Sequence, residues 1–384
     1  MMKRRDFICK GIAGTAGSWL FATAGKSIFS QEKTDLSSIA AARKGHPLYF
    51  DGLILSLEDT KNKEDFRDSG LSGFIWDVSY VEEKDGKYVR LFLPCLKSIA
   101  RANRLLRENE YGLFLATKGS RVTEARQSGK TAVFLQFQSC EPFTDDLDLM
   151  GAFYELGLRI CQVTHHSTNP FGGGSIEKEW TGLTDKGFKA IEKMNDLGII
   201  PDLAHGNEVL CRDILKTSKK PVVASHTCCR AIVKNARCIT DPVIKGVADS
   251  GGLVAIMPLS WWITNDPVPT VDHYLRHLEH VINVGGIDAV GLSHDQTVTG
   301  NLEAAKLNND NTEAIKLSLD WWKRQQAAGI LGFEDLPRHS IIPELNNVRR
   351  LFTIQAALER KGHTSAEIEK IMGLNWVRVL TQCL

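Results

Sequence analysis

The sequence of 384 residues lacks several patterns that would assign it to a common class of protein. It has no C-x-x-C pair, which excludes the usual zinc-ribbon and thioredoxin patterns. No G-x-G-x-x-G motif or P-loop follows an expected strand, which argues against a nucleotide-binding fold. The net charge is only +1 and no basic stripe is present, so we expect no nucleic-acid partner. Beyond the N-terminus no apolar run is long enough to span a bilayer, so we expect no transmembrane segment in the mature protein.

The first 24 residues have the order of a secretory signal. A basic opening that contains Arg4 and Arg5 precedes a mildly apolar run rich in Gly and Ala, and an A-x-A cleavage pattern follows at 22–24. The arginine pair is typical of twin-arginine export signals. We therefore predict a signal peptide over 1–24, a polar linker over 25–45 and an exported, periplasmic mature protein.

Eight cysteines remain after the signal peptide. An even number in an exported protein allows disulfides, but a chain of this length does not need them to stabilise a core. Because most of these cysteines stand in apolar contexts, we expect buried free thiols. A redox role for the adjacent pair Cys228 and Cys229 is not expected, since a bond between neighbours is strained.

Short apolar runs alternate with amphipathic stretches through the rest of the chain. Strands that are apolar throughout and separated by helices indicate a parallel sheet. Eight of them favour an α/β fold of the (β/α)8 TIM-barrel type, forming a single domain over 46–384. We expect an insertion with one helix near 300–345, and helices from about Pro343 onward that close the barrel, with Asn375 and Trp376 as packing residues. The expected strands lie within 46–55, 73–81, 131–138, 158–164, 198–204, 221–226, 251–257 and 288–294.

Four of the expected strands end in residues that can carry chemistry. In such a barrel the C-terminal ends of the strands form the functional face. A histidine at each of four strand ends favours one shared polar site over four separate core histidines. Imidazoles with a carboxylate suit a zinc ion that keeps one position open for water, whose pKa the ion lowers. The four ends are Thr164-His165-His166, Asp202-Leu203-Ala204-His205, Ser225-His226 and Ser293-His294-Asp295.

These segments resemble the membrane (renal) dipeptidase family of zinc metallopeptidases, within the amidohydrolase-like barrels. The resemblance covers about 48 to 382. It implies a metallo-dependent hydrolase barrel with a two-zinc site that hydrolyses dipeptides, including those with a D-residue at the C-terminal position. The segments that carry it are GAFYELGLRICQVTHHSTNPF (151–171), GLTDKGFKAIEKMNDLGIIPDLAH (182–205), PVVASHTCCRAI (221–232), HVINVGGIDAVGLSHD (280–295) and IEKIMGLNWVRVL (368–380).

The resemblance implies roles for five residues. His205 and His226 match histidines that bind one zinc, and His165 matches a histidine that faces the scissile carbonyl and stabilises the oxyanion. Arg230 matches an arginine that holds the substrate carboxylate, a task suited to its bidentate fork. Asp295 matches an aspartate that binds metal and handles the proton during attack.

The chain also departs from the pattern that the family implies. The family's first strand ends in a His-x-Asp pair for the other zinc, whereas here Leu53 and Leu55 stand at those positions. The bridging glutamate corresponds to Gln138, a weak oxygen donor, and Glu141 would serve only with a local shift of register. Two dications facing the single matched carboxylate Asp295 would repel strongly. We therefore expect at most one zinc.

Two functions stay open at this point. The first is an exported dipeptidase-like metallohydrolase that hydrolyses a dipeptide or similar small amide with zinc-bound hydroxide at a one-metal site. The second is a non-catalytic homologue, with little or no metal, that binds a small amino-acid-like ligand or acts as a scaffold. A homodimer is left open in both cases. His166 and His294 are expected to be structural, and Asp202 is expected either to orient His205 or to cap a turn.

Overall fold

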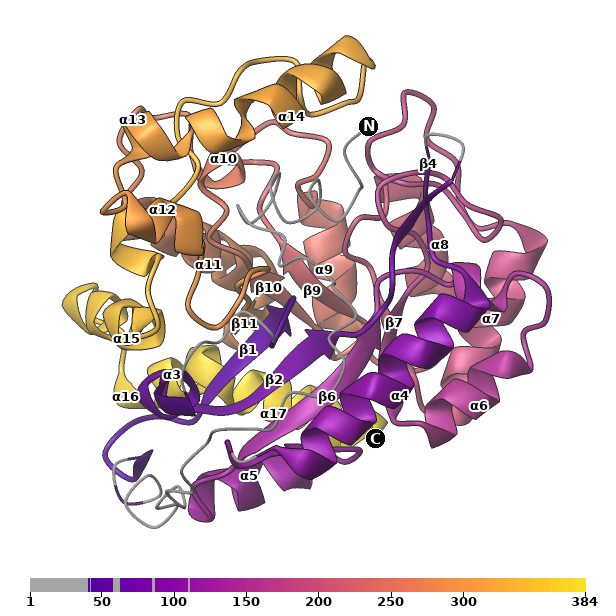
Figure 1. Cartoon of the computed structure of the whole chain (residues 1–384), viewed down its shortest axis with the longest axis horizontal. Helices are drawn as coiled ribbons and strands as arrows, with labels where there is room; N and C mark the ends of the chain where they lie inside the picture. Colours follow the sequence, from indigo (N-terminus) through magenta and orange to yellow (C-terminus); the bar gives the residue numbers. More distant parts are fainter. Residues whose placement is uncertain (1–40, 42, 58–62, 85–86, 110) are drawn as a thin grey trace, which may run out of the picture.

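Eight parallel strands form the central sheet of the computed structural model, which describes residues 41, 43–57, 63–84, 87–109 and 111–384 (Figure 1). The expected signal peptide and nearly all of the expected linker lie outside these residues. All eight expected strands are present in the predicted chain order. Their bounds are β1 (Tyr49–Ile54), β2 (Leu71–Asp77), β6 (Thr131–Phe137), β7 (Leu158–Gln162), β8 (Ile200–Asp202), β9 (Val223–Thr227), β10 (Leu253–Ile256) and β11 (Val290–Leu292).

The sheet curves round until its two edges meet. Each strand pairs in parallel with the next in this order. The segment after β11 then returns to β1, because Leu55 N–H donates to Gln296 O (3.0 Å) and Asp295 N–H donates to Leu53 O (3.0 Å). The predicted (β/α)8 barrel is thereby confirmed. Two short additions lie outside this path: β5 (Leu113–Leu115) pairs with β6, and β3 (Glu82–Lys84) forms a hairpin with β4 (Lys87–Val89).

Amphipathic helices surround the strands (Figure 1). The main helices after the strands are α4 (Phe92–Glu108), α6 (Leu149–Glu155), α7 (Asp185–Leu197), α8 (Glu208–Thr217), α9 (Asp241–Asp249) and α11 (Val271–Gly285). In α7 the residue types explain both ends: the Thr184 hydroxyl accepts from Gly187 N–H at the start, and Gly198 adopts φ 83° at the end.

C-terminal helices close the barrel, as predicted, and the last of them lies at the end opposite the strand carboxyl ends. α15 (Arg350–Arg360) and α16 (Ser365–Glu369) precede α17 (Asn375–Cys383). The Trp376 ring packs on Phe50 inside the barrel, with ring centroids 5.4 Å apart, and Asn375 Nδ2 donates to Val290 O (2.8 Å). Gly52 makes room, since a Cβ there would lie 2.7 Å from the Trp376 ring.

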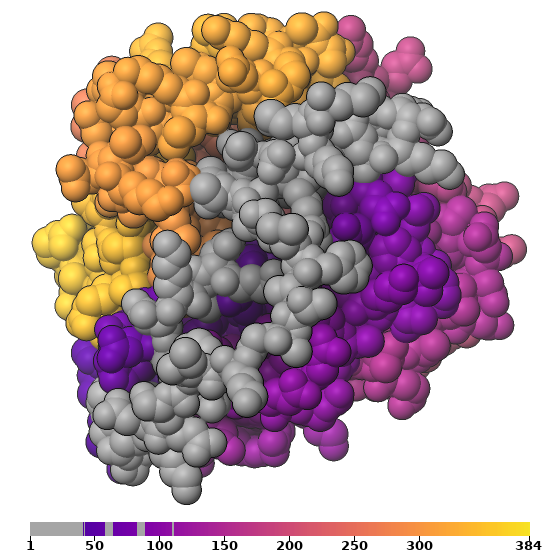
Figure 2. Space-filling model, viewed as in Figure 1, coloured from indigo at the N-terminus to yellow at the C-terminus, as the bar shows by residue number. Residues whose placement is uncertain are grey.

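The insertion differs from the expected single helix. It contains three helices, α12 (Leu302–Lys306), α13 (Asn311–Ala314) and α14 (Lys316–Ala327), and forms the upper left edge of the face in Figure 2. α12 and α13 are shorter than two turns, so their sequences show no apolar periodicity. Each begins at a polar capping residue: Asn301 accepts from Ala304 N–H, and Asp310 accepts from Thr312 N–H. α14 packs through Trp321 and Trp322, in contact with each other and with Trp261.

Two further expectations concern the cysteines and membrane-spanning helices. The described cysteines are all buried and free, as predicted; they are Cys95, Cys140, Cys161, Cys211, Cys228, Cys229, Cys238 and Cys383. Within the described ranges, no helix combines the length and apolarity needed to cross a membrane.

Candidate metal centre

Four histidines from three neighbouring strand ends lie together at the mouth of the barrel. His165 and His166 follow β7, His205 follows β8, and His226 stands in β9. The His205 ring is central: its centroid lies 4.3 Å from that of His165, 4.5 Å from that of His166 and 4.9 Å from that of His226. The two Nε2 atoms of His205 and His226 are 2.8 Å apart. Parallel strands bring these ends to one edge, as the sequence predicted.

A buried relay orients His226. The Ser225 hydroxyl donates to Asp202 Oδ2 (2.5 Å) and therefore accepts from His226 Nδ1–H (2.7 Å). This fixes the tautomer, so His226 Nε2 presents its lone pair to the site. The other Asp202 oxygen accepts from the Ala204 and Ser225 N–H groups. Asp202 thus caps the turn, which was one of the two roles expected for it. It also orients His226, through Ser225, and not His205.

His165, His205 and His226 are neutral near pH 7. Burial lowers the pKa of His165, His205 and His226 well below the usual value, and the neighbouring Arg237 cation adds to this effect in each case. Neutral imidazole is the form that binds metal. His205 Nδ1 is buried and has no hydrogen-bond partner among the described residues.

Two of the predicted site residues hold a left-handed backbone. His205 has φ 66° and Asp295 has φ 58°. A residue with a Cβ pays a steric cost of about 1 kcal/mol or more in this region. Strain of this kind persists where the surrounding structure requires it, and here it coincides with the ends of β8 and β11.

Asp295 lies beside a buried arginine that sequence reasoning missed. Burial raises the pKa of Asp295 to about 7, and the positive charge of Arg237 opposes the rise. Arg237 is 5% exposed and donates from Nη2 to His226 O (2.9 Å). It reaches the site because the loop after β9 folds back, with Arg230 N–H donating to Ile239 O (2.8 Å). No periodic pattern marks such a loop residue.

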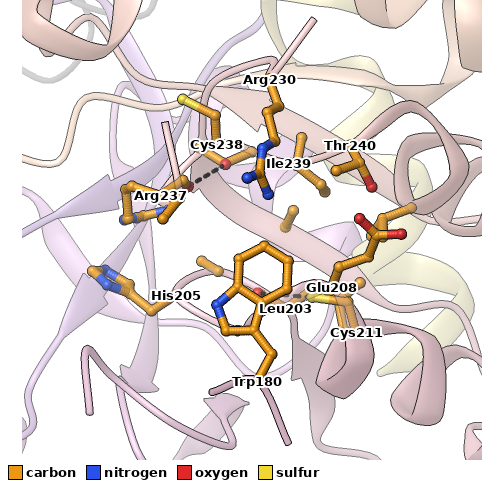
Figure 3. Close-up of a pocket in the computed structure, with 16 residues that line it drawn as sticks. Trp180, Leu203, His205, Glu208, Cys211, Arg230, Arg237, Cys238, Ile239 and Thr240 are labelled. Carbon is orange, nitrogen blue, oxygen red and sulfur yellow. Dashed lines mark hydrogen bonds between the residues drawn. The ribbon is translucent and has the colours of Figure 1, made fainter. Parts of the chain in front are cut away.

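Arg230, the expected carboxylate clamp, lies at a small cavity of about 20 Å³ that also borders His205 and Arg237 (Figure 3). Its guanidinium is 5.0 Å from the centre of the Trp180 ring. Figure 3 shows Arg230 pointing toward Trp180, while Arg237 lies on the side of His205. Two arginines are therefore available for an anionic group.

The positions that correspond to the missing family ligands, Leu53, Leu55 and Gln138, have other surroundings here. Gln138 Oε1 accepts from Arg90 Nη2 (3.4 Å), and Glu141 Oε2 accepts from Arg90 N–H (3.2 Å). Arg90 is 2% exposed, so a guanidinium occupies the surroundings of Gln138. Leu53 is fully buried, and Leu55 lines a separate cavity of about 490 Å³ between β2 and α4.

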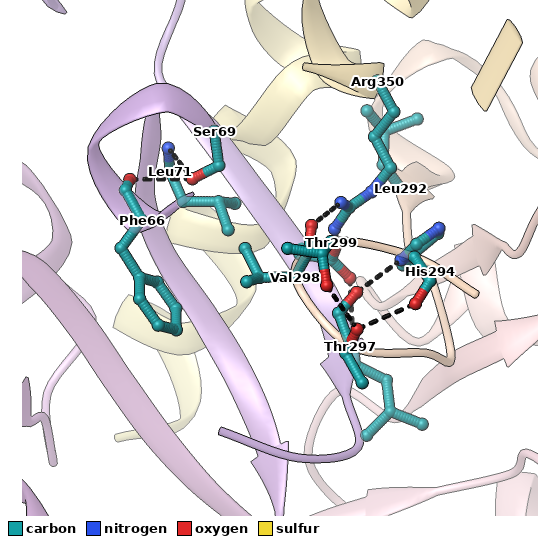
Figure 4. Close-up of polar contacts among 12 residues, drawn as sticks. Phe66, Ser69, Leu71, Leu292, His294, Thr297, Val298, Thr299 and Arg350 are labelled. Carbon is teal, nitrogen blue, oxygen red and sulfur yellow. Dashed lines mark hydrogen bonds and ion pairs between the residues drawn. The ribbon is translucent and has the colours of Figure 1, made fainter. Parts of the chain in front are cut away.

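His294 stands apart from the cluster and has a structural role, as expected. It is 2% exposed, and its Nδ1 pairs with Thr297 O (3.1 Å) within the loop after β11. Arg350 of α15 reaches the same loop and donates from Nη1 to Val298 O (2.6 Å) (Figure 4). These contacts fix the loop that begins with Asp295.

The comparisons agree with this description of a metallo-dependent hydrolase barrel. A family model described as membrane dipeptidase (peptidase family M19) matches residues 57–332. The chain therefore belongs to the membrane dipeptidase family.

Individual relatives support the same assignment. Dipeptidase tcpJ of Claviceps purpurea (strain 20.1) is 26% identical over 271 residues, which cover 70% of this chain and 55% of that protein. An uncharacterized dipeptidase of Schizosaccharomyces pombe is 27% identical over 263 residues, 66% of this chain and 53% of its own length. The chain thus spans about half the length of these curated relatives.

Solved structures share the fold. An amidohydrolase from Pseudomonas aeruginosa has a TM-score of 0.74 and 24% identity, covering 91% of this chain and 98% of its own. A metallo peptidase from Rhodobacter sphaeroides, liganded with a phosphinate mimic of the dipeptide L-Ala-D-Ala, has a TM-score of 0.69 and 18% identity. The match covers 88% of this chain and 100% of that one.

The relay through Ser225 leads to a first prediction. Ser225→Ala should weaken zinc affinity about 10–100-fold, because His226 loses the partner that orients it. The measurement is competition of the purified protein with a chelator of known affinity. Ser293→Ala is the matched control: this serine is also buried at a strand end, and its hydroxyl has no partner among the described residues. Equal affinities of both variants would contradict the relay.

Proposed function

We propose that this chain is an exported hydrolase of dipeptides or similar small amides that uses one zinc ion per chain. The observation that carries the proposal is the pair of neutral imidazoles His205 and His226, with Nε2 atoms 2.8 Å apart, beside His165 and His166. A bound zinc supplies Lewis-acid chemistry and lowers the pKa of water. The export rests on the N-terminal signal pattern.

The residues present fit one ion and not two. A cluster of imidazole nitrogen donors, of which His205 and His226 are buried, suits zinc. A second ion would need anionic ligands, but Leu53 is fully buried and apolar and Gln138 is hydrogen-bonded to Arg90. The nearby guanidinium of Arg90 also repels a second cation.

The other residues have roles in binding and proton transfer. Asp295, whose pKa burial raises to about 7, is placed to take and return a proton near neutral pH. His165 stacks on His205 at the mouth and faces the developing oxyanion. A buried, charged Arg237 next to His226 suits the terminal carboxylate of a dipeptide, and Arg230 is the second candidate.

The test is metal content together with hydrolysis. We expect one zinc per chain by elemental analysis and cleavage of a panel of L,L- and L,D-dipeptides by the zinc-loaded protein. A protein that binds no zinc and cleaves no dipeptide would refute the proposal, and a non-catalytic binder of a small amino-acid-like ligand would then be the function to pursue.

The two arginines can be separated by charge-conserving variants. Arg237→Lys should raise KM for a dipeptide about tenfold or more, because lysine loses the bidentate fork. Arg230→Lys, whose guanidinium packs on Trp180, should change KM less than threefold. A dipeptide amide, which lacks the terminal carboxylate, serves as the control substrate and should be hydrolysed equally by wild type and Arg237→Lys. The reverse ranking would assign the carboxylate to Arg230.

A further inference from the structure

His166 belongs to the metal centre by its position, although the sequence suggested a structural role. One ligand atom each from His165, His166 and His205 all lie within 4.8 Å of one another. Nitrogen ligands of a tetrahedral zinc are about 3.3 Å apart, given bonds of about 2.0 Å.

The fold holds His166 against His205 through the loop that follows β7. Ser175 N–H donates to His205 O (2.9 Å), and Gly174 pairs with Gly206 in an isolated bridge. At Gly174 an added Cβ would lie 2.0 Å from His166 O. The three glycines at 172–174 are all buried. They permit this close approach.

Charge gives the reason for a further imidazole. The carboxylate that would bridge two metals is replaced by Gln138, whose oxygen accepts from Arg90. The described cluster of ligand atoms contains no Asp or Glu. An ion held by this group would therefore have nitrogen ligands, and three of them with one open position make a common catalytic zinc site.

We propose that His166 is a ligand of the single zinc: it would join the pair His205 and His226 through its neighbour His205, whose ring centroid lies 4.5 Å away, and leave His165 for the substrate. This inference rests on the proposed one-metal function and goes beyond the residues that the family resemblance implies. It also explains why the loop is fixed by its backbone to the end of β8.

The test uses cobalt and zinc as probes. His166→Ala should lower zinc affinity at least tenfold and reduce or shift the visible absorption bands of the Co²⁺-loaded protein, which report ligand number. His280→Ala is the matched control, because this partly exposed histidine of α11 pairs with Asp241 outside the cluster. Circular dichroism and the melting temperature of the metal-free proteins check that both variants fold.

A second variant displaces His166 without removing it. Gly174→Ala should also weaken zinc binding, because the added methyl group meets His166 O. Unchanged zinc affinity and cobalt spectrum in His166→Ala would overturn the inference while leaving the one-zinc proposal intact. A wild-type protein that binds neither metal would refute the proposed function itself, so the two failures are distinguishable.

Discussion

Asp295→Asn is expected to lower kcat/KM for dipeptides about 10²–10⁴-fold while the zinc content stays close to that of the wild type. Asparagine keeps the shape of the side chain but cannot act as a general base. A loss of rate of this size is usual when a general base is removed. The cluster of ligand atoms at the mouth does not include Asp295, so the metal should remain. Asp320→Asn, on the exposed face of α14, is the control. Loss of zinc in Asp295→Asn would show that Asp295 is primarily a ligand.

The same substitution should stabilise the metal-free protein at high pH. Burial raises the pKa of Asp295 from 3.8 to about 7. Between these values the folded protein keeps the proton and the unfolded chain loses it, so the carboxyl lowers the free energy of unfolding by about 1.4 kcal/mol for each pH unit. The loss reaches roughly 4 kcal/mol above pH 7 and is absent below pH 4.

Urea unfolding at pH 5 and pH 8 measures this effect. The stability of Asp295→Asn relative to wild type should be greater at pH 8 than at pH 5, with Asp320→Asn showing no such difference. A wild type that does not lose stability relative to Asp295→Asn between these pH values would mean that Asp295 is ionised throughout. A stabilised but inactive variant would identify Asp295 as a residue kept for function at the expense of stability.

The elements that could be predicted from the sequence are those with a local signal. Eight apolar runs separated by amphipathic stretches predicted the barrel, and parallel strands place their ends together, which brought His165, His205 and His226 to one site. His166 was expected to have a structural role. It follows the end of β7 at Gln162, and its ring lies 4.5 Å from that of His205, a proximity in the loop that no strand pattern indicates.

Residues that reach the site through tertiary folding gave no local signal. Arg237 comes ten residues after β9 and reaches the site because Cys229 and Ile239 pair across the loop. Arg90 precedes α4 and bonds to Gln138, 48 positions away. The short helices of the insertion were missed because they depend on caps and on packing, not on a repeated apolar face.

Arg350→Leu is expected to lower the free energy of unfolding by about 3–5 kcal/mol. Arg350 Nη2 pairs with Asp51 Oδ2 at 2.7 Å, and the two side chains are 2% and 1% exposed. Removal of the guanidinium leaves the Asp51 carboxylate buried without its charge partner. In the surface pair of Lys193 with Asp148, whose carboxylate is 83% exposed, Lys193→Met should leave the free energy of unfolding nearly unchanged.

The double variant distinguishes an unpaired charge from lost packing. Asp51→Asn with Arg350→Leu should recover much of the stability, because no buried charge is left uncompensated. Activity should not recover to the same extent, since Arg350 Nη1 also holds Val298 O in the loop that begins with Asp295 (2.6 Å). Urea unfolding and kcat/KM of the single and double variants complete the cycle. Full recovery of both would show that the buried pair matters only for its charge balance, whereas recovery of stability alone would assign to Arg350 a role in positioning Asp295.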